Sequence, residues 1–224
     1  VQRLTDEMAD HRIKYSQVRT NYRAILEDFA KIQLHSDCKV KVGIVGEIFV
    51  KFSPLGNNNL EDFLYHVGAE VVMPGLFDFC LYCVYNNFMD GKLYGMNRLR
   101  AVGAKMIFDF LVNKQKDLIS IVQEHGVFRG PTPFVHTISL TRGYIGIGAK
   151  MGEGWLLTAE MLELIDQGVD NIICTQPFGC LPNHIVGKGM MKPIKERHPG
   201  VNIVAVDYDP GATKINQENR IKLM

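Results

Sequence analysis

The chain has 224 residues, of which 46% are hydrophobic and 22% are charged, and its 25 basic side chains nearly balance its 24 acidic ones. The balanced charge argues against a protein that binds nucleic acid by neutralising phosphates, and no apolar run is long enough to cross a membrane. The first residues are charged throughout and unlike a signal peptide, so we expect a cytoplasmic protein.

Helix and strand patterns alternate along most of the chain. Residues 4–34 predict an amphipathic helix, because their apolar side chains are spaced for one face. Four short apolar runs predict strands: 40–46, 69–73, 171–175 and 202–207. Further helices are predicted between these runs: 60–67, 155–167 and 184–198. The alternation predicts an α/β fold, a three-layer α/β/α sandwich with a mainly parallel, Rossmann- or flavodoxin-like sheet of about four strands.

The stretch between the second and third predicted strands is different. Residues 76–127 look mostly helical with no clear strand, so we expect a helical insertion. We therefore divide the chain into an N-terminal helical segment, residues 1–39, and an α/β domain, residues 40–224. The chain begins without methionine and residues 213–224 resemble a helix stopped in progress, so we expect a piece of a longer polypeptide.

Two of the five cysteines lie in one loop. Cys174 and Cys180 follow the third predicted strand, at the edge where ligands bind in open α/β sheets. Pro177 and Gly179 stiffen this loop, so the two thiols could hold a metal or an iron–sulfur cluster. The alternative is that Cys174 is a small buried core residue. Zinc bound with His184 fits less well, because structural zinc sites take four ligands at tighter spacing.

The other three cysteines lie elsewhere in the predicted fold. Cys80 and Cys83 have the C-x2-C spacing of metal ligands and share one face of a predicted helix. Aromatic side chains surround them, which favours packing in a helical core as the alternative to a ligand role. Cys38 precedes the first strand, at the amino edge of the sheet, and we assign it no role.

A glycine-rich segment precedes the helix predicted at 155–167. Gly152, Glu153 and Gly154 could form an anion-binding loop at the N-terminus of this helix, although the segment lacks the ending of a P-loop. The alternative is a tight loop in which the glycines let backbones approach closely.

Polar groups also follow the first and fourth predicted strands. Asp207 and Asp209 could bind Mg²⁺ for phosphoryl chemistry, and the alternative is a turn at Asp209 with a helix cap at Thr213. The loop after the first strand offers three residues that could contact a ligand, Lys51, Asn57 and Asn58, and the alternative there is an asparagine-rich turn. Three lysines at helical spacing predict a solvated helix face: Lys188, Lys192 and Lys195.

Several longer motifs resemble a known family. They are CTQPFGCLPNHIVGKGM (174–190), DYDPGATKINQENRIKLM (207–224), VGIVGEIFVKFSPLGNNNLEDFL (42–64) and GEGWLLTAEMLELIDQGVDNIICTQPFGC (152–180). These motifs are similar to the C-terminal part of the large CoA-substrate-specific enzyme activases, which are related to the activator of 2-hydroxyglutaryl-CoA dehydratase. The resemblance covers roughly residues 41–224.

The resemblance implies a setting in anaerobic metabolism. The family's upstream ATPase modules couple ATP hydrolysis to low-potential electron transfer into 2-hydroxyacyl-CoA dehydratases, whose subunits are α/β lobes that hold a [4Fe-4S] cluster through three cysteines. By this resemblance Cys180 is the first candidate ligand and Cys174 the second. The implied partners are ATPase modules of the same polypeptide and a 2-hydroxyacyl-CoA dehydratase. Apart from the resemblance, a homodimer of the chain stays open.

Two other functions stay open at this point. The chain could be a non-catalytic docking domain with buried cysteines, which positions the ATPase modules or a dehydratase partner. It could also be a Mg²⁺-dependent, phosphatase-like enzyme that uses Asp207 and Asp209. Only the last of these functions predicts catalysis by the isolated domain.

Overall fold

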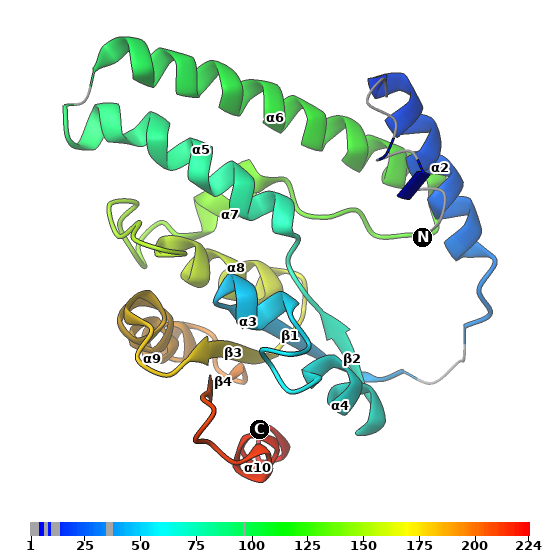
Figure 1. Cartoon of the computed structure of the whole chain (residues 1–224), viewed down its shortest axis with the longest axis vertical. Coiled ribbons are helices and arrows are strands. Elements are labelled where there is room, and N and C mark those ends of the chain that lie inside the picture. The colour runs from blue at the N-terminus through cyan, green and yellow to red at the C-terminus, as the bar shows by residue number, and fades with distance from the viewer. Residues whose placement is uncertain (1–4, 7–8, 10–13, 35–37, 96) are drawn as a thin grey trace. The chain divides into compact units, whose positions relative to one another are not determined.

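The computed structural model describes residues 5–6, 9, 14–34, 38–95 and 97–224 (Figure 1). Its internal contacts divide the chain into two units. One unit consists of Val1–Asp37 and Asp109–Pro133, and the other of Cys38–Phe108 and Phe134–Met224. The first residues of the helix predicted at 4–34 fall partly outside the described residues.

The larger unit is built on one parallel sheet. Its strands are β1 (Val40–Gly46), β2 (Ala69–Val72), β3 (Asn171–Pro177) and β4 (Asn202–Tyr208). The strands are hydrogen-bonded in the order β2-β1-β3-β4, and every neighbouring pair is parallel. The α/β fold and the parallel sheet are therefore confirmed, as are all four strand positions to within about two residues.

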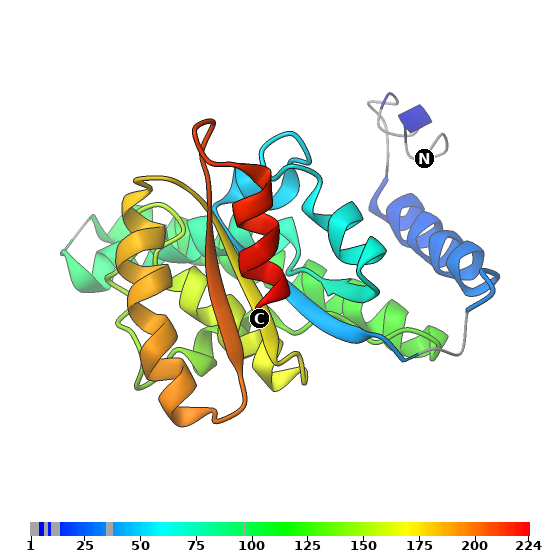
Figure 2. The same cartoon turned by 90° about the horizontal axis from the view of Figure 1, so that it is seen from below.

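Helices cover both faces of this sheet, which gives two hydrophobic cores. Cys174 of β3 packs on the face of α8 (Trp155–Asp166) and α9 (Lys188–Arg197), beside Met161 and Ile194. Its neighbour Ile173 faces α4 (Leu60–His66) and α10 (Lys214–Lys222), beside Leu64 and Ile221. In Figure 2 α10 lies in front of the strands and α8 behind them. The alternation of side chains along β3 thus separates the two cores.

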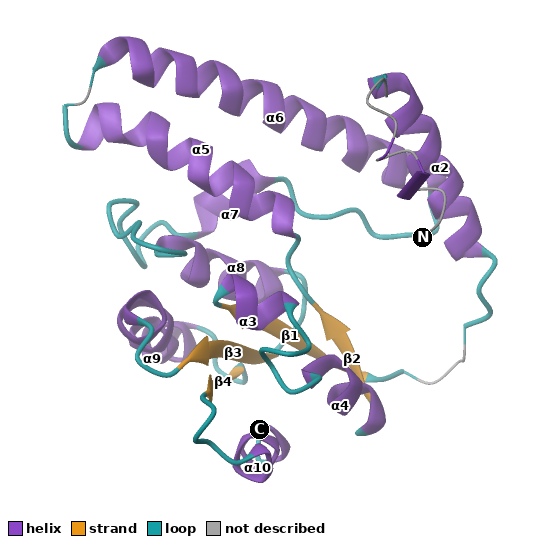
Figure 3. Cartoon of the chain, viewed as in Figure 1, coloured by secondary structure: helices purple, strands orange, loops and turns teal. Residues whose placement is uncertain are grey.

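The remaining helices differ in part from the sequence expectations (Figure 3). The predicted insertion contains α5 (Leu76–Leu93) and α6 (Arg98–His125), and it is followed by α7 (Phe134–Leu140). A short helix, α3 (Ile48–Phe52), interrupts the loop expected after β1. The helix predicted at 184–198 consists of a π-helical turn, η1 (Asn183–Gly187), that continues into α9. Among the described residues, no helix is both long and apolar enough to span a membrane.

The smaller unit packs α2 (Tyr15–Ala30) against the second part of α6. Leu26 of α2 is buried with Ile121 and Val122 of α6. The hydroxyl of Tyr15 donates to the Asp117 carboxylate over 2.8 Å. The contact division therefore places the second part of the predicted insertion with the N-terminal segment, and not with the α/β sheet.

Candidate functional site

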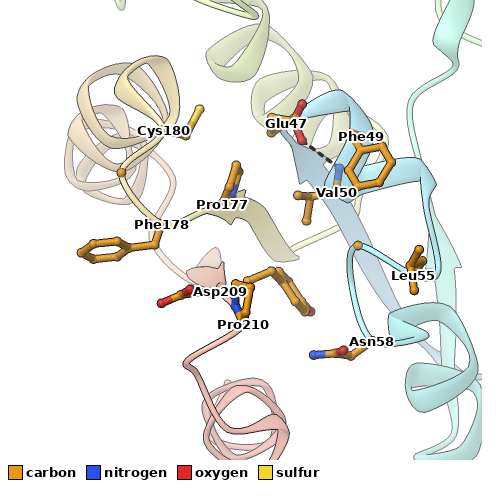
Figure 4. A pocket seen from close by; sticks show the side chains of 13 residues that line it. Glu47, Phe49, Val50, Leu55, Asn58, Pro177, Phe178, Cys180, Asp209 and Pro210 are labelled. Atoms are coloured by element: carbon orange, nitrogen blue, oxygen red, sulfur yellow. Dashed lines mark hydrogen bonds between the residues drawn. The ribbon is translucent and has the colours of Figure 1, made fainter.

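The strand order creates a cleft at the carboxyl edge of the sheet. The chain leaves β1 toward β2 on one side and returns through β3 on the other, so the loops after these strands diverge. The diverging loops line a cleft of about 730 Å³ (Figure 4). Its walls include Glu47 and Phe49 after β1, Phe178 and Cys180 after β3, and Asp209 after β4. The cleft lies where the sequence predicts a ligand site.

The wall that follows β1 starts at a glycine that no other residue can replace without strain. Gly46 has a φ of 135°, and a Cβ placed there would lie 1.9 Å from the carbonyl oxygen of Thr175. This close approach lets the Glu47 amide donate to the same oxygen over 2.9 Å. The Glu47 carboxylate then accepts from the Val50 amide over 2.8 Å and caps α3, as the dashed line in Figure 4 shows.

Lys51 faces away from the cleft, into the protein. Its ammonium donates to the Glu160 carboxylate over 2.8 Å, and the two side chains are only 1% and 2% exposed. Burial raises the pKa of Glu160, and the Lys51 charge counteracts that effect. Asn58 does line the cleft, where its amide donates to the Gln217 side chain over 2.8 Å. Asn57 is buried, and its side-chain amide donates to the Val50 carbonyl over 2.9 Å. Of these three expected ligand contacts, only Asn58 is at the cleft.

Cys174 is a buried core residue. Its side chain is fully buried, and burial, with the nearby Glu160 carboxylate, raises the pKa of its thiol to about 12. A thiol with that pKa stays protonated at neutral pH, whereas metal ligands are thiolates. The structure therefore favours the core alternative for Cys174.

Cys180 lies past the end of β3 and is partly exposed at the cleft. The side-chain amide of Asn183 donates to its sulfur over 3.2 Å. Its own carbonyl accepts from the His184 amide over 3.0 Å and contacts the His184 ring nitrogen Nδ1 at 2.9 Å. Three large apolar side chains of the same loop and of η1 are 74%, 66% and 62% exposed: Phe178, Leu181 and Ile185. Cys180 is thus a fixed thiol in an apolar, accessible surface.

Cys80 and Cys83 do not lie in a helical core, so that expectation is wrong. The buried face of α5 carries Leu81 and Tyr82, and both cysteines point away from it and are exposed. Cys38 is exposed as well. Among the described residues, no three His, Cys, Asp or Glu side chains converge as metal ligands would, so the C-x2-C pair does not complete a site with Cys180.

The segment that contains Gly152, Glu153 and Gly154 is folded onto itself. The Trp155 amide donates to the Ala149 carbonyl over 2.6 Å, and a Cβ on Gly154 would lie 2.3 Å from that oxygen. The Glu153 side chain is only 8% exposed, and its carboxylate accepts from the Ile48 amide over 3.3 Å. A carboxylate in this position repels anions, so the geometry favours the tight-loop alternative to an anion site.

Asp207 belongs to a polar cluster that the sequence did not reveal. The Gln176 amide donates to its carboxylate over 2.5 Å, and Lys188 lies 3.3 Å from both carboxylate oxygens. Burial alone would raise the pKa of Asp207, but these hydrogen bonds hold that pKa below its usual value. Asp209 accepts from the Gly211 amide over 3.3 Å, as expected of the turn alternative.

Lys188 therefore does not lie on a purely solvated helix face. It also contacts His184 Nε2 at 3.2 Å, one helical turn away. The spacing of His184 and Lys188 was the only sequence signal that could have revealed this cluster, because Gln176 lies in an otherwise apolar strand.

Comparison with protein-family models, with curated proteins and with solved structures gave no match. The function of this chain must therefore be inferred from the geometry of the cleft and from the motifs described above.

Proposed function

We propose that this domain is a lobe of a CoA-enzyme activase system in the cytoplasm, which supports ATP-coupled, low-potential electron transfer. In this proposal Cys180 supplies one cysteine ligand to a [4Fe-4S] cluster. The other ligands come from a second α/β lobe, either a dehydratase subunit or another copy of this chain. The observation that carries the proposal is one fixed, accessible thiol at the cleft formed by the diverging loops.

The residues of the cleft fit one ligand position, and they do not fit three. Cys180 is accessible and its sulfur accepts a hydrogen bond, which suits a cluster ligand. Cys174 is enclosed in the core and its thiol is protonated, so it does not fit. Because the family's clusters take three cysteines, a single lobe of this kind needs ligands from outside itself.

The surface around Cys180 suits burial against such a partner. Phe178, Leu181 and Ile185 together expose apolar side chains next to the thiol. An apolar surround keeps water from a cluster and influences its reduction potential. A bound cluster supplies one-electron transfer. The chain's own residues exclude water, through this surface, and orient the sulfur, through the hydrogen bond from Asn183.

Anaerobic reconstitution with ferric iron, sulfide and excess 2-mercaptoethanol tests the proposal, because the small thiol reduces part of the iron and can fill the missing ligand positions. We expect bound iron and sulfide with visible absorption in the wild type and in Cys174→Ala, and loss of all three in Cys180→Ala. Equal amounts of iron and sulfide in the wild type and in Cys180→Ala would contradict a ligand role for Cys180.

The exposed apolar side chains also support the second candidate, a docking domain without a cluster. A dehydratase component that binds this chain equally well after Cys180→Ala, and less well after Leu181→Ser, would favour docking. If both variants lose binding, the thiol itself belongs to the interface, as the cluster proposal requires.

A further inference from the structure

The end of the helical hairpin formed by α5 and α6 differs in charge from the rest of the chain. Residues 91–108, which we call the hairpin end, belong to the larger unit and contain four basic residues and no acidic one. Over the whole chain, 25 basic residues are balanced by 24 acidic ones. The basic residues of the hairpin end are Lys92, Arg98, Arg100 and Lys105. The hairpin end therefore attracts negative charge, which the chain as a whole does not.

Local signals end α5 and start α6 (Figure 1). Gly95 follows α5 with a φ of 67°, the left-handed conformation typical of the residue that ends a helix. The amide of Leu99 donates to the side-chain oxygen of Asn97 over 2.9 Å, as at the start of a helix. A Cβ on Gly91 would lie 2.7 Å from the Cβ of Ala101, so the two helices pack closely. The hairpin end is thus a folded part of the larger unit.

Large apolar side chains lie on the outer surface of the hairpin end. Leu99, Val102 and Met106 follow one another at helical spacing on α6 and are 81%, 58% and 68% exposed. Tyr94, which follows α5, is 60% exposed. We call these four residues the apolar strip. Apolar side chains that gather in contact with water mark a surface that binds a partner or a membrane.

Basic side chains lie on both flanks of the apolar strip. At about 100° per residue along α6, Arg98 falls on one side of Leu99 and Arg100 on the other. Both arginines are exposed. An apolar strip between basic flanks is typical of a helix that lies in the interface of a membrane. A membrane offers phosphates on every side of an inserted strip, so cations on both flanks are matched at once.

We propose that the hairpin end binds the surface of a membrane that contains anionic lipids. The apolar strip enters the headgroup region, and the two flanking arginines contact lipid phosphates. The ring and hydroxyl of Tyr94 suit the same depth, where one end of the side chain is apolar and the other is wet. None of these residues lines the cleft, so the inference goes beyond the proposed function and does not depend on Cys180.

Co-sedimentation of the 224-residue chain with unilamellar vesicles tests the proposal. We expect binding to phosphatidylcholine vesicles with about one third phosphatidylglycerol, little binding to phosphatidylcholine alone, and loss of binding in about 0.5 M salt. The double variant Arg98→Gln, Arg100→Gln should bind about thirtyfold more weakly, because each cation near an anionic surface contributes about fivefold. Leu99→Ser should bind about tenfold more weakly, because it removes an inserted apolar side chain.

Matched controls remove the same groups from other surfaces. The double variant Lys192→Gln, Lys195→Gln removes two exposed cations from α9, and Leu223→Ser removes a side chain that is 88% exposed. Both should bind the anionic vesicles to within about twofold of the wild type, because these groups lie outside the contact. Equal binding of the wild type and the double arginine variant, or no binding of the wild type to anionic vesicles, would overturn the inference.

Fluorescence separates insertion from adsorption. Brominated lipid should quench the new tryptophan of Leu99→Trp, whereas Trp155 of the wild type is fully buried and should not be quenched. Unquenched fluorescence in Leu99→Trp would contradict insertion. Binding to polyglutamate but not to anionic vesicles would assign the surface to an acidic protein partner and overturn the membrane proposal. Cys180→Ala should bind vesicles as the wild type does, so this inference and the proposed function can fail separately.

Discussion

Cys174 and Cys180 are close in sequence and share one amide partner, Asn183, yet their surroundings are opposite. Cys174 is a residue of β3 and packs between the sheet and the helices on one face. Cys180 follows the strand, where the loops diverge at the cleft. The difference shows that the end of the strand separates a buried thiol from a thiol that is accessible at the cleft.

Charged pairs show the same contrast between the interior and the rim. Lys51 and Glu160 form an ion pair that is buried in the interior. Lys188 and Asp207 form an ion pair that is only partly buried, so water still reaches it. Buried pairs are costly to break because the remaining charge has no compensation, while exposed pairs contribute little. Changes in the interior should therefore alter stability, and changes at the rim should alter binding.

The largest expected loss of stability comes from Gly46→Ala. The added Cβ would overlap the Thr175 carbonyl, so the β1–β3 contact must open, and the free energy of unfolding should fall by on the order of 5 kcal/mol. Gly179→Ala is the matched control, because Gly179 also has a positive φ of 76° but a Cβ added there would meet no atom within 4 Å. It should cost about 1 kcal/mol. Urea denaturation measures the free energy of unfolding of both variants. Equal losses in the two would contradict the interpretation that the close approach of Gly46 to Thr175 causes the larger loss.

Lys51→Met should lower the free energy of unfolding by about 4 kcal/mol, because it leaves the Glu160 carboxylate buried without its cation. Lys192→Met is the control for an exposed pair, because Lys192 and Glu196 on α9 are 86% and 64% exposed. It should change stability by less than about 0.5 kcal/mol. If urea denaturation gives the same free energy of unfolding for the two variants, the buried pair stabilises the protein no more than the exposed pair does.

Alkaline pH should destabilise the wild type more than Cys174→Ala. The pKa of Cys174 is about 12 in the folded protein against an ordinary value of 9.0, so the folded state resists losing this proton. The associated stability is complete below pH 9 and is lost between pH 9 and pH 12, at up to about 1.4 kcal/mol per pH unit. Urea denaturation at several pH values measures the difference, and parallel curves for the two proteins would contradict a buried, protonated thiol.

The smallest effect on stability is expected at the apolar rim. Phe178→Ser and Leu181→Ser remove side chains that are 74% and 66% exposed, so the free energy of unfolding should change by less than about 0.5 kcal/mol. The same variants should weaken partner binding if this surface docks. A thermal melt measures stability, and a loss above about 1 kcal/mol would show that these side chains belong to the folded core.

The sequence predicted the strands well because buried parallel strands need continuous apolar runs, as in Val40–Gly46 and Asn202–Tyr208. It missed α3, Ile48–Phe52, because five residues are too few to show helical periodicity. The prediction that Cys80 and Cys83 lie in a helical core was wrong, because aromatic neighbours in sequence do not show which face of a helix is buried.

By itself the sequence determined the succession of strands and helices along the chain. This succession also placed Cys180 after a strand, at the carboxyl edge of the sheet. Local patterns suffice for this, because strand ends and turns depend on neighbouring residues. Only the tertiary structure decided which thiol is buried and which partners the polar groups take. Cys174 lies against Gly187, Lys51 meets Glu160, and Asn183 reaches both sulfurs. Burial and these contacts depend on segments far apart in the chain, which meet only when the sheet and its helices pack together.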